Sequence, residues 1–461
     1  MVKIMTLEEK QAKLRKQASA SIVYQRLKHN MSQKELADKI GTKRSNISRI
    51  ESGTQNISLD MLAKIQDVFK NGIELEVNED QTLYYEISDY SLRLYDIDLL
   101  NFKMERALDV SAHITWINED CKQLFPVDLE LSDEGLFDWL KSRSIPQHRE
   151  FVGAILQAVG LEISDVKGLI DICKGLSLND SYWIVPQGFR GTFDSYNLYD
   201  NKFDEALALV AYTGAPYSTP RLKSTPELTT GGMLRKAWRN MGFDGIYLYK
   251  GGTQDFANAG NEPFSEFYAS QVAKTMGLNA IEYELVHWKG ILASKCKLFT
   301  NKNCSYVPIG HVVKTGGLQA CLDFYKTLGE DFYDELCSML VFDYVIINED
   351  RHFGNFGLLR DNKTGEYISP APIFDNGNGL LCYAMLSDFE NIDAYIKTRN
   401  TPYGLSFENM AKMVCGKKQK AQLRKLINFK FKQSDLVNLP DWRLRAIEEI
   451  IQKRGHKLLE E

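Results

Sequence analysis

The sequence lacks the features that place a chain in a membrane or outside the cell. It contains no run of about eighteen apolar residues, the length that a membrane-spanning helix needs. The N-terminus is polar and rich in lysine, without the apolar stretch of a secretory signal. The eight cysteines form neither a C-x-x-C pair nor a Cys/His group at zinc-ligand spacing, so free and mostly buried thiols are expected. We therefore expect a protein of the cytoplasm that has no membrane partner.

Length and charge indicate several domains with different partners. At 461 residues the chain exceeds what one hydrophobic core usually supports, so about two to four domains are expected. Residues 1–70 carry 14 Lys and Arg against 7 Asp and Glu, whereas the whole chain has a formal charge of −5. Residues 1–70, the N-terminal head, thus have a formal charge of +7, and the remainder of the chain has a formal charge of −12. A basic block on an acidic body is typical of a head that binds a polyanion.

A two-helix pattern lies within the basic block. The stretch SQKELADKIG predicts a helix that Ser32 caps and Gly41 ends. A second helix is expected from about Lys43, with Ile47 and Ile50 on its inner face and polar or cationic residues on its outer face. Two helices joined by a short turn that contains glycine are the parts of a helix-turn-helix.

This pattern, S-Q-x-E-L-A followed by G and then S-x-I-S-R-I-E-S-G, resembles the Xre/Cro-type DNA-binding domain. The resemblance implies a domain over residues 1–78 that binds double-stranded DNA, with a homodimer on the DNA. It also implies a set of residues at the nucleic acid, which are Gln33, Lys43, Arg44, Ser45, Asn46 and Arg49. The alternative is a small helical bundle with a solvated basic face.

The most informative stretch is residues 342–379. It holds Asp350-Arg351-His352 with Asn355 five residues after the aspartate, and then Asp375-Asn376-Gly377 after a hairpin-like excursion. Phosphoryl transfer uses this set, because one aspartate meets the attacking hydroxyl while an asparagine and a second aspartate hold magnesium. The alternative is a pair of surface Asx turns around a hairpin.

Upstream of this stretch lie the signals of a phosphate site. Thr229-Thr230-Gly231-Gly232 precedes a predicted strand over residues 246–249 that ends at Lys250, and Glu266 follows in a predicted helix. Paired glycines let backbone N–H groups approach phosphates, and a strand lysine held by a helix glutamate can bind the α- and β-phosphates. Each signal alone is weak, because such turns and ion pairs are common. Their order along the chain is that of a protein kinase.

The motifs depart from those of common protein kinases. There is no G-x-G-x-x-G, and DRH and DNG stand in place of HRD and DFG. With these departures, residues 213–383 resemble the HipA-type serine/threonine kinases of bacterial toxin–antitoxin systems. The resemblance implies an α+β chain: an all-α helix-turn-helix domain, then a two-lobed protein-kinase-like fold with a mixed α/β N-lobe and a mostly helical C-lobe. The expected domains are residues 1–78, an α/β subdomain of unassigned role at 83–212, the N-lobe at 213–310 and the C-lobe at 311–461.

The same resemblance implies a role for individual residues. Asp350 is the expected catalytic base, and Asn355 and Asp375 are the expected ligands of Mg²⁺. Residues 229–236 are the expected phosphate loop and residues 297–299 the expected adenine hinge. The residues expected at ATP are Thr230, Gly231, Gly232, Lys236, Lys250, Glu266, Lys297, Phe299 and Asn355. Thr229, seven residues before Lys236, is the expected autophosphorylation site.

The implied function is that of an ATP- and magnesium-dependent serine/threonine protein kinase that carries its own DNA-binding domain. Such a chain is expected to act on a protein substrate as a toxin–antitoxin-type transcription regulator in the bacterial cytoplasm, associated with the nucleoid. One alternative is a transcriptional regulator whose kinase-like body only senses nucleotide, although the presence of Asp350, Asn355, Asp375 and Lys250 argues against it. Another is a kinase that acts on a small molecule or a lipid, since the motifs leave the acceptor open.

Overall fold

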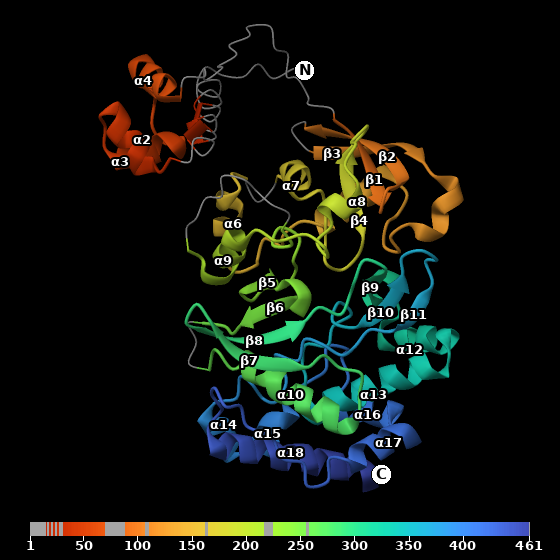
Figure 1. Ribbon diagram of the computed structural model, residues 1–461. Coiled ribbons are helices and arrows are strands. Elements are labelled where there is room, and N and C mark those ends of the chain that lie inside the picture. The colour runs from red at the N-terminus through yellow and green to blue at the C-terminus, as the bar shows by residue number, and fades with distance from the viewer. Residues whose placement is uncertain are drawn as a thin grey trace. The chain divides into compact units, whose positions relative to one another are not determined.

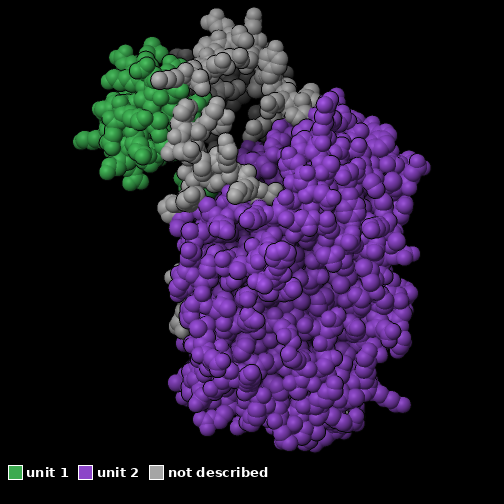
Figure 2. All heavy atoms as spheres, in the orientation of Figure 1, with its two compact units in different colours: residues 1–85, 157–160, 218–222 green, residues 86–156, 161–217, 223–461 purple. Residues whose placement is uncertain are grey.

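The computed structural model describes residues 15, 18–19, 22–23, 25–26, 31–69, 88–106, 110–161, 165–215, 225–254 and 258–460. The chain forms two compact units (Figure 2). The first comprises residues 1–85, 157–160 and 218–222, and the second comprises residues 86–156, 161–217 and 223–461. None of the helices in these described ranges has the length and apolar character that crossing a membrane requires.

The first unit contains the predicted helix pair. Ser32 caps α2 (Gln33–Ile40), because its hydroxyl accepts from the N–H of Glu35 while the Glu35 carboxylate accepts from the N–H of Ser32. Gly41 ends α2 at φ 71°, a conformation that glycine adopts without strain. The helices α3 (Arg44–Glu51) and α4 (Leu59–Phe69) complete the unit. Their shared core holds Leu36, Ala37, Ile40, Ile47, Ile50, Ile65 and Phe69.

The second unit begins with an antiparallel four-stranded sheet in the order β3-β2-β1-β4. Its strands are β1 (Ser88–Leu94), β2 (Ile97–Arg106), β3 (Val110–Ile117) and β4 (Tyr182–Pro186). Between β3 and β4 the chain forms η1 (Glu119–Leu124), α5 (Asp133–Ser142), α6 (Val152–Ala158) and α7 (Val166–Cys173). Helix α5 packs against β3 and contributes Leu136, Trp139 and Leu140 to the core of this sheet. The short helix α8 (Phe193–Tyr196) and α9 (Glu205–Thr213) follow β4.

A second antiparallel sheet has the order β5-β6-β8-β7 (Figure 1). Its strands are β5 (Lys236–Asn240), β6 (Ile246–Gly251), β7 (Tyr283–Trp288) and β8 (Ile291–Lys297), with the 3-10 turn η2 (Gly242–Asp244) between β5 and β6. Helix α9 packs against β5, and α10 (Glu262–Met276) packs against β6, β7 and β8. Helix α10 is buried almost all round, which is typical of a helix between two layers of a core.

The remainder of the unit is mostly helical. A small sheet in the order β11-β10-β9 is formed by β9 (Cys304–Pro308), β10 (Gly357–Asp361) and β11 (Tyr367–Pro370), so the predicted hairpin before Asp375 is present. Helix α13 (Glu330–Ile346) contacts α12 (Gly317–Leu328), α16 (Phe407–Val414), α17 (Lys417–Arg424) and α18 (Asp441–Glu460). The other helices here are α11 (Ile309–Val312), α14 (Leu386–Glu390) and α15 (Ile392–Lys397). The largest hydrophobic core of the described residues surrounds α13.

The predicted fold class is confirmed: helices at the N-terminus precede a body of mixed sheets and helices, and its last part is mostly helical. The predicted domain boundaries remain predictions. All eight cysteines lie in the described part of the chain, and none of them forms a disulfide. Four of them are buried and four are partly exposed, so fewer are buried than the sequence suggested.

Candidate active site

Two lysines stand side by side where the second sheet begins. Strands β5 and β6 pair antiparallel with Lys236 directly opposite Lys250, which places both side chains on one face of the sheet. Both residues are buried. Burial disfavours the charged amine, and the neighbouring Lys250 repels it further, so the pKa of Lys236 falls to about 7. Lys236 therefore titrates near neutral pH.

Lys250 meets two carboxylates from different elements. Its Nζ lies 3.0 Å from Oε1 of Glu266 on α10 and forms a second ion pair with Oδ1 of Asp375. Burial alone would lower the pKa of Lys250, but Asp375 and Glu266 outweigh it and raise that pKa above its usual value. Burial likewise opposes ionisation of Asp375, yet Lys250 and Lys236 bring the pKa of this carboxyl down to about 2. Lys250 is thus cationic and Asp375 anionic at neutral pH.

The turn that carries Asp375 is attached to the same helix glutamate. The N–H of Asn376 donates to Oε2 of Glu266 at 2.8 Å, and the N–H of Asp375 donates to the hydroxyl of Tyr283 at 3.2 Å. Asp375 itself has φ 55°, a left-handed conformation that is uncommon for an aspartate. Glu266 therefore positions both the strand lysine and the acidic turn, which brings together three of the predicted site residues.

Asp350 and Asn355 lie on the loop that follows α13. The side-chain N–H of Asn355 donates to the carbonyl oxygen of Asp350 at 2.9 Å, which leaves the Oδ1 of Asn355 available as a ligand atom. The Asp350 carboxylate accepts no hydrogen bond from the residues that the structure describes. Burial and the negative charge of Asp375 raise the pKa of Asp350. A half-buried carboxylate with a raised pKa and free oxygens has the properties of a general base.

Arg351 links this loop to the acidic turn. Its guanidinium is fully buried and pairs with Asp343 of α13 at 3.0 Å. It also donates to the side-chain oxygen of Asn376 at 2.5 Å, to the carbonyl of Asn355 at 3.1 Å and to the carbonyl of Phe374. One arginine thus fixes the position of the Asp350 loop relative to the turn that carries Asp375.

The donor atoms fit a magnesium ion that is shared with phosphates. Among the described residues, no three His, Cys, Asp or Glu side chains cluster as an all-protein metal site would require. Magnesium instead commonly takes one or two carboxylates together with substrate phosphates and water. The Asp375 carboxylate and the Oδ1 of Asn355 supply such a partial set of hard oxygen ligands.

The predicted phosphate loop lies directly before β5. Gly231 and Gly232 are exposed, and Gly232 has φ 83° with the ammonium of Lys236 against its Cα, so a side chain at this position would displace Lys236. The hydroxyl of Thr230 donates to the carbonyl of Pro226 at 2.7 Å. Gly232 and Lys236 are therefore in contact.

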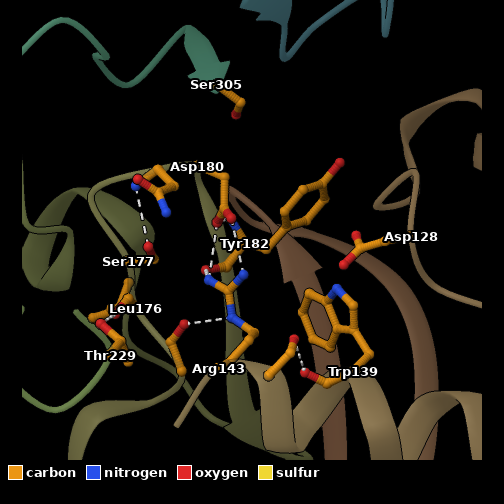
Figure 3. Close-up of polar contacts among 12 residues, drawn as sticks. Asp128, Trp139, Arg143, Leu176, Ser177, Asp180, Tyr182, Thr229 and Ser305 are labelled. Atoms are coloured by element: carbon orange, nitrogen blue, oxygen red, sulfur yellow. Dashed lines mark hydrogen bonds and ion pairs between the residues drawn. The ribbon is translucent and has the colours of Figure 1, made fainter. Parts of the chain in front are cut away.

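Thr229 faces away from the lysines. Its hydroxyl donates to the carbonyl of Leu176 at 2.7 Å, beside a cavity that Arg143, Asp180 and Tyr182 also line (Figure 3). Neither Lys236 nor Lys250 lines this cavity. In this conformation the Thr229 hydroxyl is used to hold a turn, and its predicted modification would require that turn to open.

The predicted adenine hinge is the segment by which the chain leaves the second sheet. Lys297 is the last residue of β8 and is exposed. The ring of Phe299 packs 5.4 Å from that of Phe374 and 5.6 Å from that of Tyr306. Because Phe374 immediately precedes Asp375, Phe299 is connected to the acidic turn by packing, while its contact with adenine remains a prediction.

In the first unit, most of the predicted DNA-contacting residues lie on the surface of α3 or at its start. Lys43, Arg44, Ser45 and Arg49 are exposed, and Asn46 is partly exposed with its side chain donating to Thr42 at 3.0 Å. Gln33 differs from the others. Its side chain donates at 2.9 Å to the Glu51 carboxylate, which Arg26 also holds at 2.5 Å.

Sequence reasoning missed two buried ion pairs near the site. One is Arg351 with Asp343, and the other is Arg149 with Glu227, whose side chains are both 0% exposed and meet at 2.6 Å. Asp343 offered a signal, because a carboxylate within the apolar run of α13 requires a buried partner. Arg149 lies in no motif, and its partner is 78 residues away, so no local pattern reveals it.

The first unit contains a helix-turn-helix, a type of domain that binds DNA. In the second unit a strand lysine, a helix glutamate and a turn aspartate meet, and the chain also carries an Asp-Asn loop. Together these features define a kinase-like protein with a domain of a DNA-binding type. Residues 22–74 match the family model described as Helix-turn-helix, which confirms the predicted domain in this part of the chain. A stretch of 157 residues is 29% identical to the serine/threonine-protein kinase CtkA of Helicobacter pylori strain J99. That match covers 30% of this chain and 48% of CtkA, so the chain spans about half the length of this curated relative.

Two solved structures are similar to parts of the chain. The crystal structure of the H. pylori proinflammatory kinase CtkA matches with a TM-score of 0.38 and 19% identity, over 50% of this chain and 90% of that one. A chain of the toxin–antitoxin complex of HipA, HipB and operator DNA from Shewanella oneidensis MR-1 matches with a TM-score of 0.46 and 11% identity, over 80% of this chain and 97% of that one. The helix-turn-helix match and the partial identity with a serine/threonine-protein kinase agree with the two parts that the sequence predicted.

Proposed function

We propose that this chain is an ATP- and magnesium-dependent serine/threonine protein kinase with its own DNA-binding domain. The observation that carries the proposal is the meeting of Lys250, Glu266 and Asp375 from a strand, a helix and a turn. A protein kinase uses the same three residue types to hold phosphates and metal. The identity with the kinase CtkA over 157 residues supports it independently.

In the proposed reaction each side chain performs one task. Lys236 and Lys250 bind the phosphates of ATP, and the backbone of Gly231 and Gly232 approaches the same oxygens. Asp350 accepts the proton of the substrate hydroxyl as that oxygen attacks the terminal phosphorus, while the bond from that phosphorus to the bridging oxygen breaks and ADP leaves. Asn355 and Asp375 would hold magnesium, which when bound would neutralise phosphate charge during transfer.

The helix-turn-helix unit extends this proposal to gene regulation. The exposed Lys43, Arg44 and Arg49 form a cationic surface on the recognition helix, which favours contact with double-stranded DNA. We propose a homodimer on a pseudo-palindromic site, a protein as the phosphate acceptor, and regulation of the toxin–antitoxin type in the bacterial cytoplasm. Autophosphorylation at Thr229 belongs to the same proposal, and mass spectrometry after incubation with Mg-ATP tests it.

The decisive experiment uses a whole-cell extract as the source of the phosphate acceptor, so the class of acceptor does not have to be assumed. Purified protein is incubated with terminally labelled ATP, magnesium and a whole-cell extract, which is then separated into protein, lipid and small-molecule fractions. Label in the protein fraction that disappears with Asp350→Asn and with Asp375→Asn supports the proposal. Label in another fraction identifies a lipid or small-molecule kinase. ATP binding without transfer to any fraction identifies a nucleotide sensor.

A further inference from the structure

The turn between α5 and α6 presents two consecutive charged residues to the predicted phosphate loop. The first, Arg149, is fully buried and contacts both ends of that loop. Two residues before the loop, its guanidinium donates to the Glu227 carboxylate at 2.6 Å and to the Glu227 carbonyl at 2.7 Å. Further along, it donates to the carbonyls of Thr230 at 3.1 Å and Lys236 at 3.0 Å.

The second residue, Glu150, holds the last part of the loop. Its carboxylate accepts from the backbone N–H of Arg235 at 3.0 Å and from the Arg235 guanidinium at 2.7 Å. Its own N–H donates to the carbonyl of Met233 at 2.8 Å. The Arg235 side chain is 5% exposed, whereas that of Glu150 is 28% exposed.

Together these contacts fix the loop at its ends and leave its centre free. Residues 227, 230, 233, 235 and 236 are all bonded to Arg149 or Glu150. Gly231 and Gly232, between the fixed points, remain exposed, and Gly232 lies against the ammonium of Lys236. The hydroxyl of Thr229 adds a third attachment, to Leu176 (Figure 3).

We propose that Arg149 and Glu150 form a clamp that positions the phosphate loop. The region that contains the first sheet thereby contributes to nucleotide binding through this loop. This proposal rests on the proposed kinase function, because it assumes that the loop binds the phosphates of ATP. Arg149 and Glu150 are positioning residues, since they act through the loop backbone. The clamp is also a control point, because any event that separates Glu150 from Arg235 loosens the last part of the loop, next to Lys236.

Glu150 is the better residue to test. Removal of Arg149 leaves the buried charge of Glu227 without its cationic partner, a change that is strongly destabilising. Glu150 is partly exposed, so Glu150→Ala lets Arg235 and the loop move into water with little effect on the core. A matched control exists in the same region: Asp171 pairs with Lys167 at 2.8 Å, with side chains 42% and 5% exposed. Asp171→Ala therefore removes a comparable ion pair that does not touch the loop.

The test compares two ligands that differ in their phosphates. Dissociation constants of MgATP and of adenosine are measured for the wild-type full-length protein and both variants. Glu150→Ala should weaken MgATP binding about fivefold or more and leave adenosine binding unchanged, because only the phosphates use the loop. Asp171→Ala should change neither constant. Wild-type affinity for MgATP in Glu150→Ala, or equal weakening of both ligands, would overturn the clamp.

Amide hydrogen exchange supplies a readout that does not depend on nucleotide. In the Glu150→Ala variant, exchange across residues 229–236 should become faster than in the wild type and in Asp171→Ala, since the Arg235 N–H loses its acceptor. Unchanged exchange in this segment would contradict the clamp. If wild-type protein fails to bind MgATP while the exchange result holds, the kinase proposal falls and the clamp remains.

Discussion

Lys236 provides a direct test of the phosphate site, because its protonation should change when nucleotide binds. Burial and the adjacent Lys250 lower the pKa of Lys236 to about 7 in the free protein. The phosphates of ATP are anionic, so their binding next to this amine favours its charged form and raises its pKa again. Above neutral pH, the protein must therefore take up a proton as it binds MgATP.

The size of the effect follows from that pKa. At pH 8 about one tenth of the Lys236 amines are protonated in the free protein, so binding takes up about 0.9 proton, against about 0.1 proton at pH 6. The same linkage predicts that MgATP binds roughly tenfold more weakly at pH 8 than at pH 6, or about 1.4 kcal/mol. The sign is definite: affinity decreases as the pH rises through the pKa of the free lysine.

Calorimetry in buffers of different ionisation enthalpy measures this proton uptake. Lys236→Met is the matched control, since methionine fills the buried space with an apolar chain and cannot titrate. In this variant, the proton uptake assigned to Lys236 should disappear, and binding should be weaker at pH 6 with a reduced pH dependence. Proton release by the nucleotide itself is common to both proteins and cancels. Equal uptake at pH 8 in wild type and Lys236→Met would refute the reasoning.

Three further predictions concern the other parts of the chain. Asp350→Asn should reduce the phosphoryl-transfer rate by about 10²- to 10⁴-fold without altering MgATP affinity. Because the pKa of Asp350 is raised, the acidic limb of the wild-type pH–rate profile, measured by steady-state kinetics, should lie above the usual pKa range of an aspartate. Arg351→Met should lower the free energy of unfolding by about 3–5 kcal/mol, because it leaves the buried Asp343 carboxylate without its cationic partner. The double variant Arg351→Met with Asp343→Leu should regain stability but not activity. A fully active double variant would contradict this prediction. Arg44→Ala should weaken DNA binding and reduce the slope of log affinity against log salt by about 1, whereas an unchanged slope argues against a phosphate contact by this residue.

The fold could be predicted where local chemistry determines it. Ser32 and Glu35 form a capping box within four consecutive residues, and Gly41 ends the helix through its own backbone preference. The hairpin before Asp375 and the helix that carries Glu266 are also local patterns. The order of strands in each sheet is not local, because β4 pairs with β1 across almost ninety intervening residues. No periodicity in the sequence specifies that pairing.

The site could be predicted in part for a related reason. Lys250 and Glu266 are sixteen residues apart and belong to adjacent elements, so their ion pair could be anticipated from the order of a strand and a helix. Gln33 stays a predicted DNA contact, and its hydrogen bond to Glu51 is a further contact that no local motif indicates. Arg149 and Glu227 come from segments that have no shared pattern, and only folding brings them together. Long-range ion pairs depend on topology, which single motifs do not encode.

Three buried ion pairs surround the site, and each one attaches a loop or a turn to a separate element. Lys250 with Glu266 joins a strand to α10, Arg351 with Asp343 joins the Asp350 loop to α13, and Arg149 with Glu227 joins the phosphate loop to the turn before α6. Buried pairs contribute little net stability, because desolvation of the charges offsets their attraction. Their directional contacts instead fix position, and in each case the fixed segment carries residues proposed to bind phosphate or metal. Of the two clamp residues, Glu150 has access to water and Arg149 has none, so the clamp should open first at the pair of Glu150 with Arg235.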